Sequence, residues 1–378
     1  MRKIALRVTP TFIAMLLVLI GMQTFIIQPG IVQGFVTGLG LTAAHAGYLA
    51  AAETSGIAVA TIACAIVGNA LSWRAMCAFG LAILAGCDLA SAFVAQYPAL
   101  LALRFAAGLA EGVLISLGYA AVGRASNPDR AFGYLITIVL TYGALGLLGI
   151  PAAIAHGGMK SIMLTLASMA LLGLAAVRWF PEPGRTAARS PASPSGLGLR
   201  RRELAMLLAV LAFFLGQGVI WAYLFLIGTR MGLGSQAVAN ALTIAQFAGI
   251  AGALSAATIC LKLPRLLTLA LGTVCILVGL LLFSYRLGAL GFSLAAVAFN
   301  WAANLLTPFL IALVADLNQR LVQTAAALQM TGLALGPALA ALSVTSGHYT
   351  TILVVSAALA ALTLLFGGYA HGRAAMIH

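Results

Sequence analysis

Three of the seven acidic residues in this sequence lie inside long apolar stretches. Glu53 is the first acid in the chain, Asp88 lies in the next apolar stretch, and Glu111 shares a third stretch with Arg104. Ionisable residues are costly inside a membrane, so they are rare there and usually serve function. A buried carboxyl group can take up and release a proton, pair with a cation, or bind a cationic solute. Glu53, Asp88, Arg104 and Glu111 are therefore the candidate residues for proton coupling, in which the binding and release of a proton is coupled to the work of the protein.

Helical rise places Asp88 and Arg104 at similar depths. Asp88 lies nine residues before the turn at 96–97 and Arg104 lies seven after it, which corresponds to about 13 Å and 11 Å from the outer end. We expect the two to pair across this hairpin. Glu53 lies about 15 Å into its own span, and Glu111 lies two helical turns beyond Arg104 on the same face. The alternative is a static buried ion pair that only fixes helix packing.

The composition determines which kind of element must position these residues. Only 7% of the residues are charged and 63% are hydrophobic, whereas a soluble domain is roughly 25% charged. A soluble fold could not cover so much apolar side chain with so little polar surface. The chain is therefore expected to be an all-α membrane protein in a lipid bilayer, and its net charge of +13 indicates membrane topology rather than nucleic-acid binding.

Segments of about 20 apolar residues are long enough to cross a bilayer as helices. Dividing the chain at glycines, prolines and charge clusters predicts twelve transmembrane helices. The Pro-, Ser- and Arg-rich segment 181–202 divides them into an N-terminal half, 1–180, and a C-terminal half, 203–378. The predicted spans are 11–36, 43–67, 75–96, 98–122, 131–154 and 160–180 in the first half, and 204–228, 235–259, 265–285, 288–314, 322–345 and 349–370 in the second.

Basic residues predict the orientation of these spans. Twelve crossings place both termini and the linker on one side, which receives sixteen Lys and Arg residues, whereas the other side receives three. Positive charge is retained on the cytoplasmic side. We therefore expect a multi-pass protein of the inner cell membrane with both termini and the linker in the cytoplasm.

The two halves resemble each other in sequence. Residues 42–60 and 235–253, aligned without gaps, share eight identities in nineteen positions, including Gly56-Ile57-Ala58 with Gly249-Ile250-Ala251. In this alignment Glu53 corresponds to Gln246. Two parallel six-helix halves with a site between them are typical of secondary transporters.

Several motifs resemble the major facilitator superfamily across essentially the whole chain. "LLALRFAAGLAEG" (100–112) is similar to the family's fourth-span motif, with its Arg at Arg104 and its Gly at Gly108. "GRASNPDRAFGY" (123–134) and "ADLNQRLVQTAA" (315–326) resemble the loops after spans 4 and 10, and "GLALGPALA" (332–340) resembles span 11. "GNALSWRAMC" (68–77) departs from the pattern, because Ser72 stands where the family has an Asp that helps to latch the inward gate.

The resemblance implies that spans 1, 4, 7 and 10 line a central cavity. Amides and indoles lie near the middle of these spans and are suited to bind a small, partly apolar organic solute. Helix-to-helix hydrogen bonds are the alternative role for each of them. The candidate substrate-binding residues are Gln23, Gln28, Gln217, Trp221, Asn300, Trp301 and Asn304.

These observations favour a secondary active transporter that moves a small organic molecule by alternating access and is coupled to protons. The alternatives are an uncoupled facilitator or exchanger, and a non-transporting membrane scaffold or enzyme. The sequence has no phosphate-binding loop and no zinc-protease or nucleophile-elbow motif, which argues against ATP as the energy source and against an enzyme. We expect a monomer with no cofactor, no metal and no nucleic-acid partner.

Overall fold

The computed structural model describes residues 10–67, 71–182, 200–258, 263–285, 287–344 and 349–372, and every regular element in these ranges is a helix. Most of the linker predicted at 181–202, residues 183–199, lies outside the described residues. The first half contains α1 (Pro10–Gly21), α2 (Gln23–Ile26), α3 (Gln28–Leu39), α4 (Ala43–Val67), α5 (Trp73–Ser91), α6 (Tyr97–Val122), α7 (Pro128–Ala176) and η1 (Val177–Trp179). The second half contains α8 (Arg201–Trp221), α9 (Leu224–Arg230), α10 (Ser235–Thr258), α11 (Arg265–Ser284), α12 (Gly288–Leu317), η2 (Gln319–Leu321), α13 (Val322–Ser343) and α14 (Thr350–Gly372).

These helices account for the twelve predicted crossings. In the described part of the chain, ten helices are long and apolar enough to span a membrane. One of them, α7, contains two spans, because the chain reverses at Gly158, whose φ of 62° and ψ of −159° are not helical. A left-handed φ favours glycine at this turn. The first span is broken into α1, α2 and α3, so no single piece of it reaches spanning length. The predicted twelve-helix fold is confirmed.

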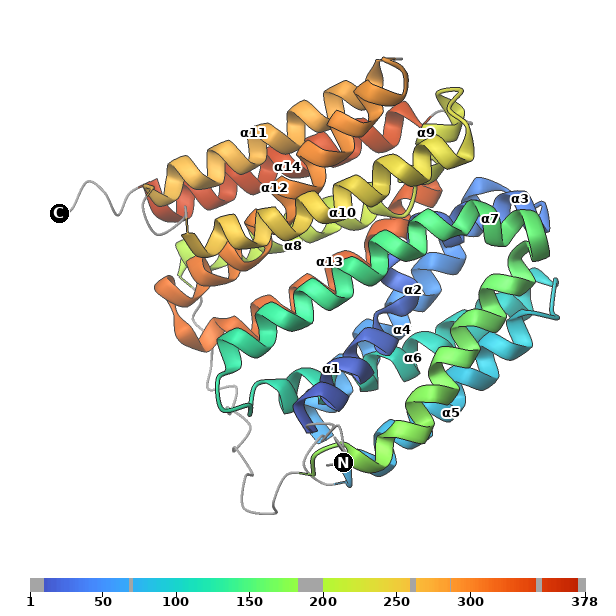
Figure 1. Ribbon diagram of the computed structural model, residues 1–378. Coiled ribbons are helices and arrows are strands. Elements are labelled where there is room, and N and C mark those ends of the chain that lie inside the picture. Colours follow the sequence, from blue (N-terminus) through green and yellow to red (C-terminus); the bar gives the residue numbers. More distant parts are fainter. Residues whose placement is uncertain are drawn as a thin grey trace, which may run out of the picture.

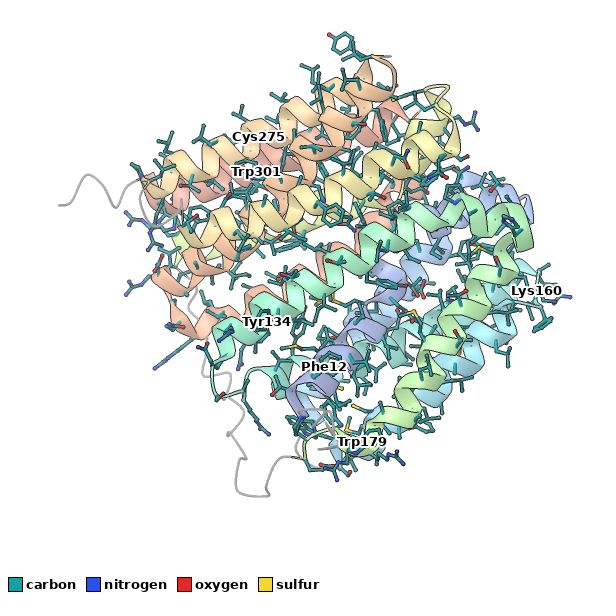
Figure 2. All side chains as sticks on the ribbon, in the orientation of Figure 1. Phe12, Tyr134, Lys160, Trp179, Cys275 and Trp301 are labelled. Atoms are coloured by element: carbon teal, nitrogen blue, oxygen red, sulfur yellow. The ribbon has the colours of Figure 1, made fainter. Side chains whose placement is uncertain are left out.

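Large apolar side chains cover the outside of the bundle, while polar side chains lie within it (Figure 2). A helix satisfies its own backbone hydrogen bonds, so it can present such a surface to lipid. Five large apolar residues have at least 65% of their surface exposed: Phe79, Phe93, Leu172, Leu290 and Leu365. The solvent that this surface fits is the hydrocarbon of a bilayer.

The helices of the first half, α1–α7, pack together on one side, and those of the second half, α8–α14, pack on the other (Figure 1). The packing repeats, since α4 and α5 pack on α6 in the first half as α10 and α11 pack on α12 in the second. The halves meet where α4 packs on α13 and α7 packs on α10. These two contacts are equivalent under the repeat, as expected for two related halves.

We name the two ends of the bundle by their loops. The linker end contains the α6–α7 turn, Trp179 and the start of α8, and the far end contains the turn at Gly158 and the start of α10. Figure 2 shows Lys160 at the far end and Phe12 and Trp179 at the linker end. At the far end the halves are joined by hydrogen bonds from Tyr223 Oη to the carbonyl oxygen of Ala43 (2.9 Å) and from Thr229 Oγ1 to Gln33 Oε1 (3.4 Å).

Candidate functional site

A cavity of about 330 Å³ lies between the two halves and extends toward the linker end. It is lined by the middle of the bundle and by the linker-end turns of α7, α12 and α13. Its apolar wall includes Met22, Phe25, Phe214 and Met330. None of the described residues that line it is charged. Its polar lining residues are Thr54, Tyr119, Gln217, Trp221, Gln246, Asn300, Asn304, Thr307 and Gln329.

Three amide side chains of the cavity form one hydrogen-bonded chain. Asn300 Nδ2 donates to the carbonyl oxygen of Ala245 (2.7 Å) and to Gln246 Oε1 (3.2 Å). Asn304 Nδ2 donates to Asn300 Oδ1 (3.2 Å), which the i, i+4 spacing on α12 permits. Each amide in such a chain keeps spare donors or acceptors. The wall can therefore hydrogen-bond a solute without holding a charge against it.

The first transmembrane span is not a continuous helix beside this cavity. It is interrupted at Met22 and Ile27, on either side of α2. Side chains of the other half bond the carbonyl groups exposed there. Trp221 Nε1 donates to the carbonyl oxygen of Phe25 (3.0 Å), and Gln246 Nε2 donates to that of Ile26 (3.4 Å).

A charge cluster lies inside the first half, behind the cavity wall. We use this name for Glu53, Asp88, Arg104 and Glu111, all of which are buried. Arg104 Nη2 donates to Asp88 Oδ1 (2.8 Å), and Arg104 Nη1 donates to Glu53 Oε1 (3.2 Å). The same guanidinium also donates to Ser91 Oγ (2.9 Å) and to the carbonyl oxygen of Cys87 (3.4 Å). Arg104 therefore holds α4, α5 and α6 together.

Glu111 is the member of the charge cluster that Arg104 does not bond. Neither of its carboxyl oxygens has a hydrogen-bond partner among the described residues. The hydroxyl group of Thr24 on α2 neighbours both Glu111 and Glu53. Three buried carboxyl groups thus accompany one guanidinium group, and full ionisation would leave two uncompensated negative charges.

The structure divides the predicted site residues between these two places. Gln217, Trp221, Asn300 and Asn304 line the cavity. Gln23 lies against the charge cluster instead, since its Nε2 donates to Asp88 Oδ2 (3.3 Å). Gln28 is buried outside the lining, and Trp301 is half-buried outside it, with its carbonyl group packed on Gly252 of α10.

Several lining residues were not singled out by the sequence. Gln246 had a signal, because it occupies the repeat position of Glu53. For Gln329 and Tyr119 the sequence signal was weaker, since each is only a polar residue within a predicted span. No feature of the sequence pointed to Thr307. Ser91, which bonds Arg104 in the charge cluster, was not singled out either. It lies three residues after Asp88, and this spacing places both on one helical face.

A carboxylate from a segment distant in sequence bonds the loop before α5 at the linker end. This is the loop in which Ser72 replaces the Asp of the family pattern. Glu182, just after η1, accepts hydrogen bonds from Ser72 Oγ (2.6 Å) and from the backbone N–H groups of Trp73 (3.1 Å) and Arg74 (2.8 Å). Partial burial opposes ionisation of Glu182, but these three bonds outweigh it and lower the pKa of Glu182. The N-terminus of α5 therefore has an anion although the loop itself lacks the Asp.

Metal binding has no support in the part of the chain that the structure describes, where no group of three or more His, Cys, Asp or Glu side chains is arranged to hold an ion. The described cysteines, Cys64, Cys77, Cys87 and Cys275, are all unpaired.

Comparison with known proteins identifies the family and the fold. The family model of the Major Facilitator Superfamily matches residues 13–341. A D-xylose-proton symporter has a similar structure, with a TM-score of 0.73 and 16% identity over 94% of this chain and 96% of the symporter. A mutant of the nucleoside transporter NupG gives a TM-score of 0.77 with 11% identity over 96% of this chain and 99% of the other. No curated protein sequence matches the chain.

Proposed function

Because the chain belongs to the Major Facilitator Superfamily and is a membrane transporter rather than an enzyme, we propose that it is a secondary active transporter driven by protons. Its substrate is a small, uncharged organic molecule, and it acts as a monomer in the inner membrane with both termini in the cytoplasm. The solved relatives differ in the solutes that their names give, so the substrate class is argued from the cavity.

The observation that carries the proposal is the imbalance of the charge cluster. One Arg104 accompanies three buried carboxyl groups, and Glu111 has no hydrogen-bond partner among the described residues. An unpaired buried charge is strongly unfavourable, so at least one carboxyl group in this arrangement carries a proton. Such a proton can leave when the group is exposed to water, and this supports proton coupling through Glu53, Glu111 and Asp88.

The cavity supports the substrate class. Its described lining presents amides, hydroxyls, an indole and apolar side chains but no charge. A charged solute would lose its hydration without gaining a counter-ion. An uncharged solute with hydrogen-bonding groups can bond Gln217, Asn300 and Asn304 and pack on Trp221.

The arrangement of the halves supports alternating access. Hydrogen bonds join them at the far end, and the cavity extends toward the linker end. With the linker end in the cytoplasm, this is an inward-facing state, and rocking of the halves about the cavity would expose the site to the other side.

The experiment measures whether a proton gradient drives accumulation. A thermal-shift screen of uncharged solutes, including D-xylose and nucleosides, selects a ligand, since a ligand that binds the folded state raises its stability. Uptake of that radiolabelled ligand is then measured in proteoliposomes with and without an imposed pH gradient, for the wild type, Glu53→Gln and Glu111→Gln. We expect each variant to lose gradient-driven accumulation but to retain exchange, because the amide keeps the shape and cannot carry the proton.

Glu203→Gln is the matched control, because Glu203 lies at the surface of the linker end, outside the charge cluster. It should accumulate the ligand like the wild type. Wild-type accumulation in both cluster variants would refute proton coupling and favour the uncoupled facilitator or exchanger.

A further inference from the structure

The short helix α2 contacts both the charge cluster and the cavity. On one side, Gln23 Nε2 donates to Asp88 Oδ2 (3.3 Å) and to the carbonyl oxygen of Leu166 on α7 (3.4 Å). The next residue, Thr24, neighbours Glu53 and Glu111. Both side chains are buried. This side of α2 therefore lies against the carboxyl groups of the charge cluster.

The other side of α2 faces the solute and the second half. Met22, Phe25 and Ile26 line the cavity. Pro29 has no N–H to donate to the carbonyl group of Phe25, and the N–H of Gly30 bonds Ile27 instead of Ile26. The carbonyl group of Ile26 is thus open to side chains, and that of Phe25 accepts, from the backbone, only the N–H of Ile27. Gln246 and Trp221 of the second half bond these two carbonyl groups.

We infer that α2 is the link through which the charge cluster controls the contact between the halves, and that Gln23 is the positioning residue of this link. The inference rests on the proposed proton coupling. A bond from Gln23 to the Asp88 carboxylate is charge-assisted when Asp88 is ionised. When a carboxyl oxygen of the charge cluster takes up a proton from solution, the hydrogen bonds that Arg104 and Gln23 donate to the carboxyl groups rearrange. This shift moves α2 and with it the two carbonyl groups that the second half holds.

The groups that decide the protonation come from several elements. Those that face Asp88 and its neighbours are Glu53 from α4, Cys87 from α5, Arg104 and Glu111 from α6, and Tyr142 from α7. Gln23 is uncharged, so its removal leaves the number of titrating groups unchanged. Its removal breaks their connection to α2 and takes one hydrogen bond from the Asp88 carboxylate, so Trp221→Phe, which removes a bond on the other side of α2, tests the link apart from that bond.

The test measures the distance between the halves as a function of pH, without any solute. Spin labels are attached after Ser126→Cys and Gln319→Cys, at exposed linker-end positions of the two halves, in a chain whose five native cysteines are replaced by alanine. Pulsed electron-spin resonance in lipid nanodiscs between pH 5 and pH 9 gives the midpoint of the distance change. Gln23→Met and Trp221→Phe remove the bonds on the two sides of α2 while nearly keeping the shape.

We expect each variant to move the midpoint by about one pH unit, a tenfold change in proton affinity, or to remove the pH dependence. The controls are Gln28→Met, an equally buried amide on the same span, and Trp301→Phe, an indole outside the cavity lining. Both should keep the wild-type midpoint.

The outcomes separate the two proposals. A pH-dependent wild type with unchanged midpoints in Gln23→Met and Trp221→Phe would refute the role of α2 and leave proton coupling standing. An equal shift in the controls would also refute it, because the effect would then be general. A wild type without pH dependence would refute proton coupling and the link together. If Gln23→Met does not fold, Trp221→Phe decides, since it lies in the other half.

Discussion

At the scale of single residues, Arg104 organises the first half. From α6, its guanidinium group bonds two carboxylates, a hydroxyl and a carbonyl group that belong to two other helices, α4 and α5. A buried ion pair gains little over apolar packing, but removing one partner leaves an uncompensated charge. Removing one partner of the ion pair should therefore destabilise this region more than replacing both partners.

A double-mutant cycle tests this dependence. We expect Arg104→Gln to lower the free energy of unfolding by about 3–5 kcal/mol, because it leaves the carboxyl groups without a cation. Asp88→Asn should lower it less, because Arg104 keeps its bond to Glu53. The double variant should lose less than the sum of both, because Asp88 and Arg104 are then removed together and neither is left without the other. Thermal and denaturant unfolding of purified protein in detergent measures all four forms. Strictly additive losses would mean that the two residues do not interact in solution.

At the scale of elements, close packing of α4 on α6 places Glu53 within reach of Arg104. A Cβ atom on Gly108 would overlap the backbone carbonyl group of Glu53, and one on Gly56 would overlap that of Phe105. Small residues allow helix backbones to approach in this way within membranes. The glycine of the fourth-span motif thus serves the geometry of the charge cluster.

Gly108→Ala should therefore separate the helices and weaken the Glu53–Arg104 contact. We expect a loss of about 1–3 kcal/mol, as for other overpacked sites, together with loss of gradient-driven transport. Gly86→Ala on α5 is the control, because nothing lies within 4 Å of the added methyl group. It should be neutral or slightly stabilising, since alanine favours helix. Equal melting temperatures for the two variants would contradict the packing argument.

The N-terminus of α5 depends on Glu182 for its anion. The folded pKa of Glu182 lies below its ordinary value, because Ser72 and two backbone N–H groups outweigh partial burial. The stabilisation is therefore fully present above the unfolded pKa of about 4.3. It is lost as the pH falls through the folded value.

Glu182→Gln should remove this stabilisation at neutral pH. The expected loss is about 1 kcal/mol or less, the range of a helix cap at an exposed site. The difference in melting temperature between wild type and variant should be largest near pH 7 and should vanish in strong acid. A difference that is independent of pH would show that the charge of Glu182 does not matter.

At the scale of the whole molecule, the basic residues are concentrated at the end of the bundle toward which the cavity extends. The linker end contains Arg124, Arg130, Arg178 and Arg320, and the cavity extends toward it. The positive-inside rule assigns this end to the cytoplasm. In the proposed orientation the cavity extends toward the inside, and hydrogen bonds join the halves at the far end.

Cysteine labelling tests this orientation. Ser126→Cys and Gln236→Cys, in a background without native cysteines, place single thiols at exposed positions of the linker end and the far end. We expect a membrane-impermeant maleimide to label Gln236→Cys in intact cells and Ser126→Cys only after the membrane is opened. Labelling of Ser126→Cys in intact cells would reverse the topology.

The sequence by itself determined the class of protein, the twelve crossings and the relation between the halves. These properties follow from local rules, because a span of about 20 apolar residues must close its own hydrogen bonds in lipid. It also determined depth, since each helical residue advances about 1.5 Å. Asp88 and Arg104, which their spacing placed at similar depths, are bonded in the structure.

Only the tertiary structure decided which side of each helix faces the cavity. Gln23 and Gln217 lie 194 residues apart, close to the 193-residue offset between segments 42–60 and 235–253. Gln23 nevertheless bonds Asp88 in the charge cluster, whereas Gln217 lines the cavity. Depth along a span is set by counting residues, whereas the rotation of a helix about its axis is set by what packs around it. The breaks at Met22 and Ile27 turn α2 so that Gln23 meets Asp88. Residues distant in sequence, such as Trp221 and Gln246, hold it there.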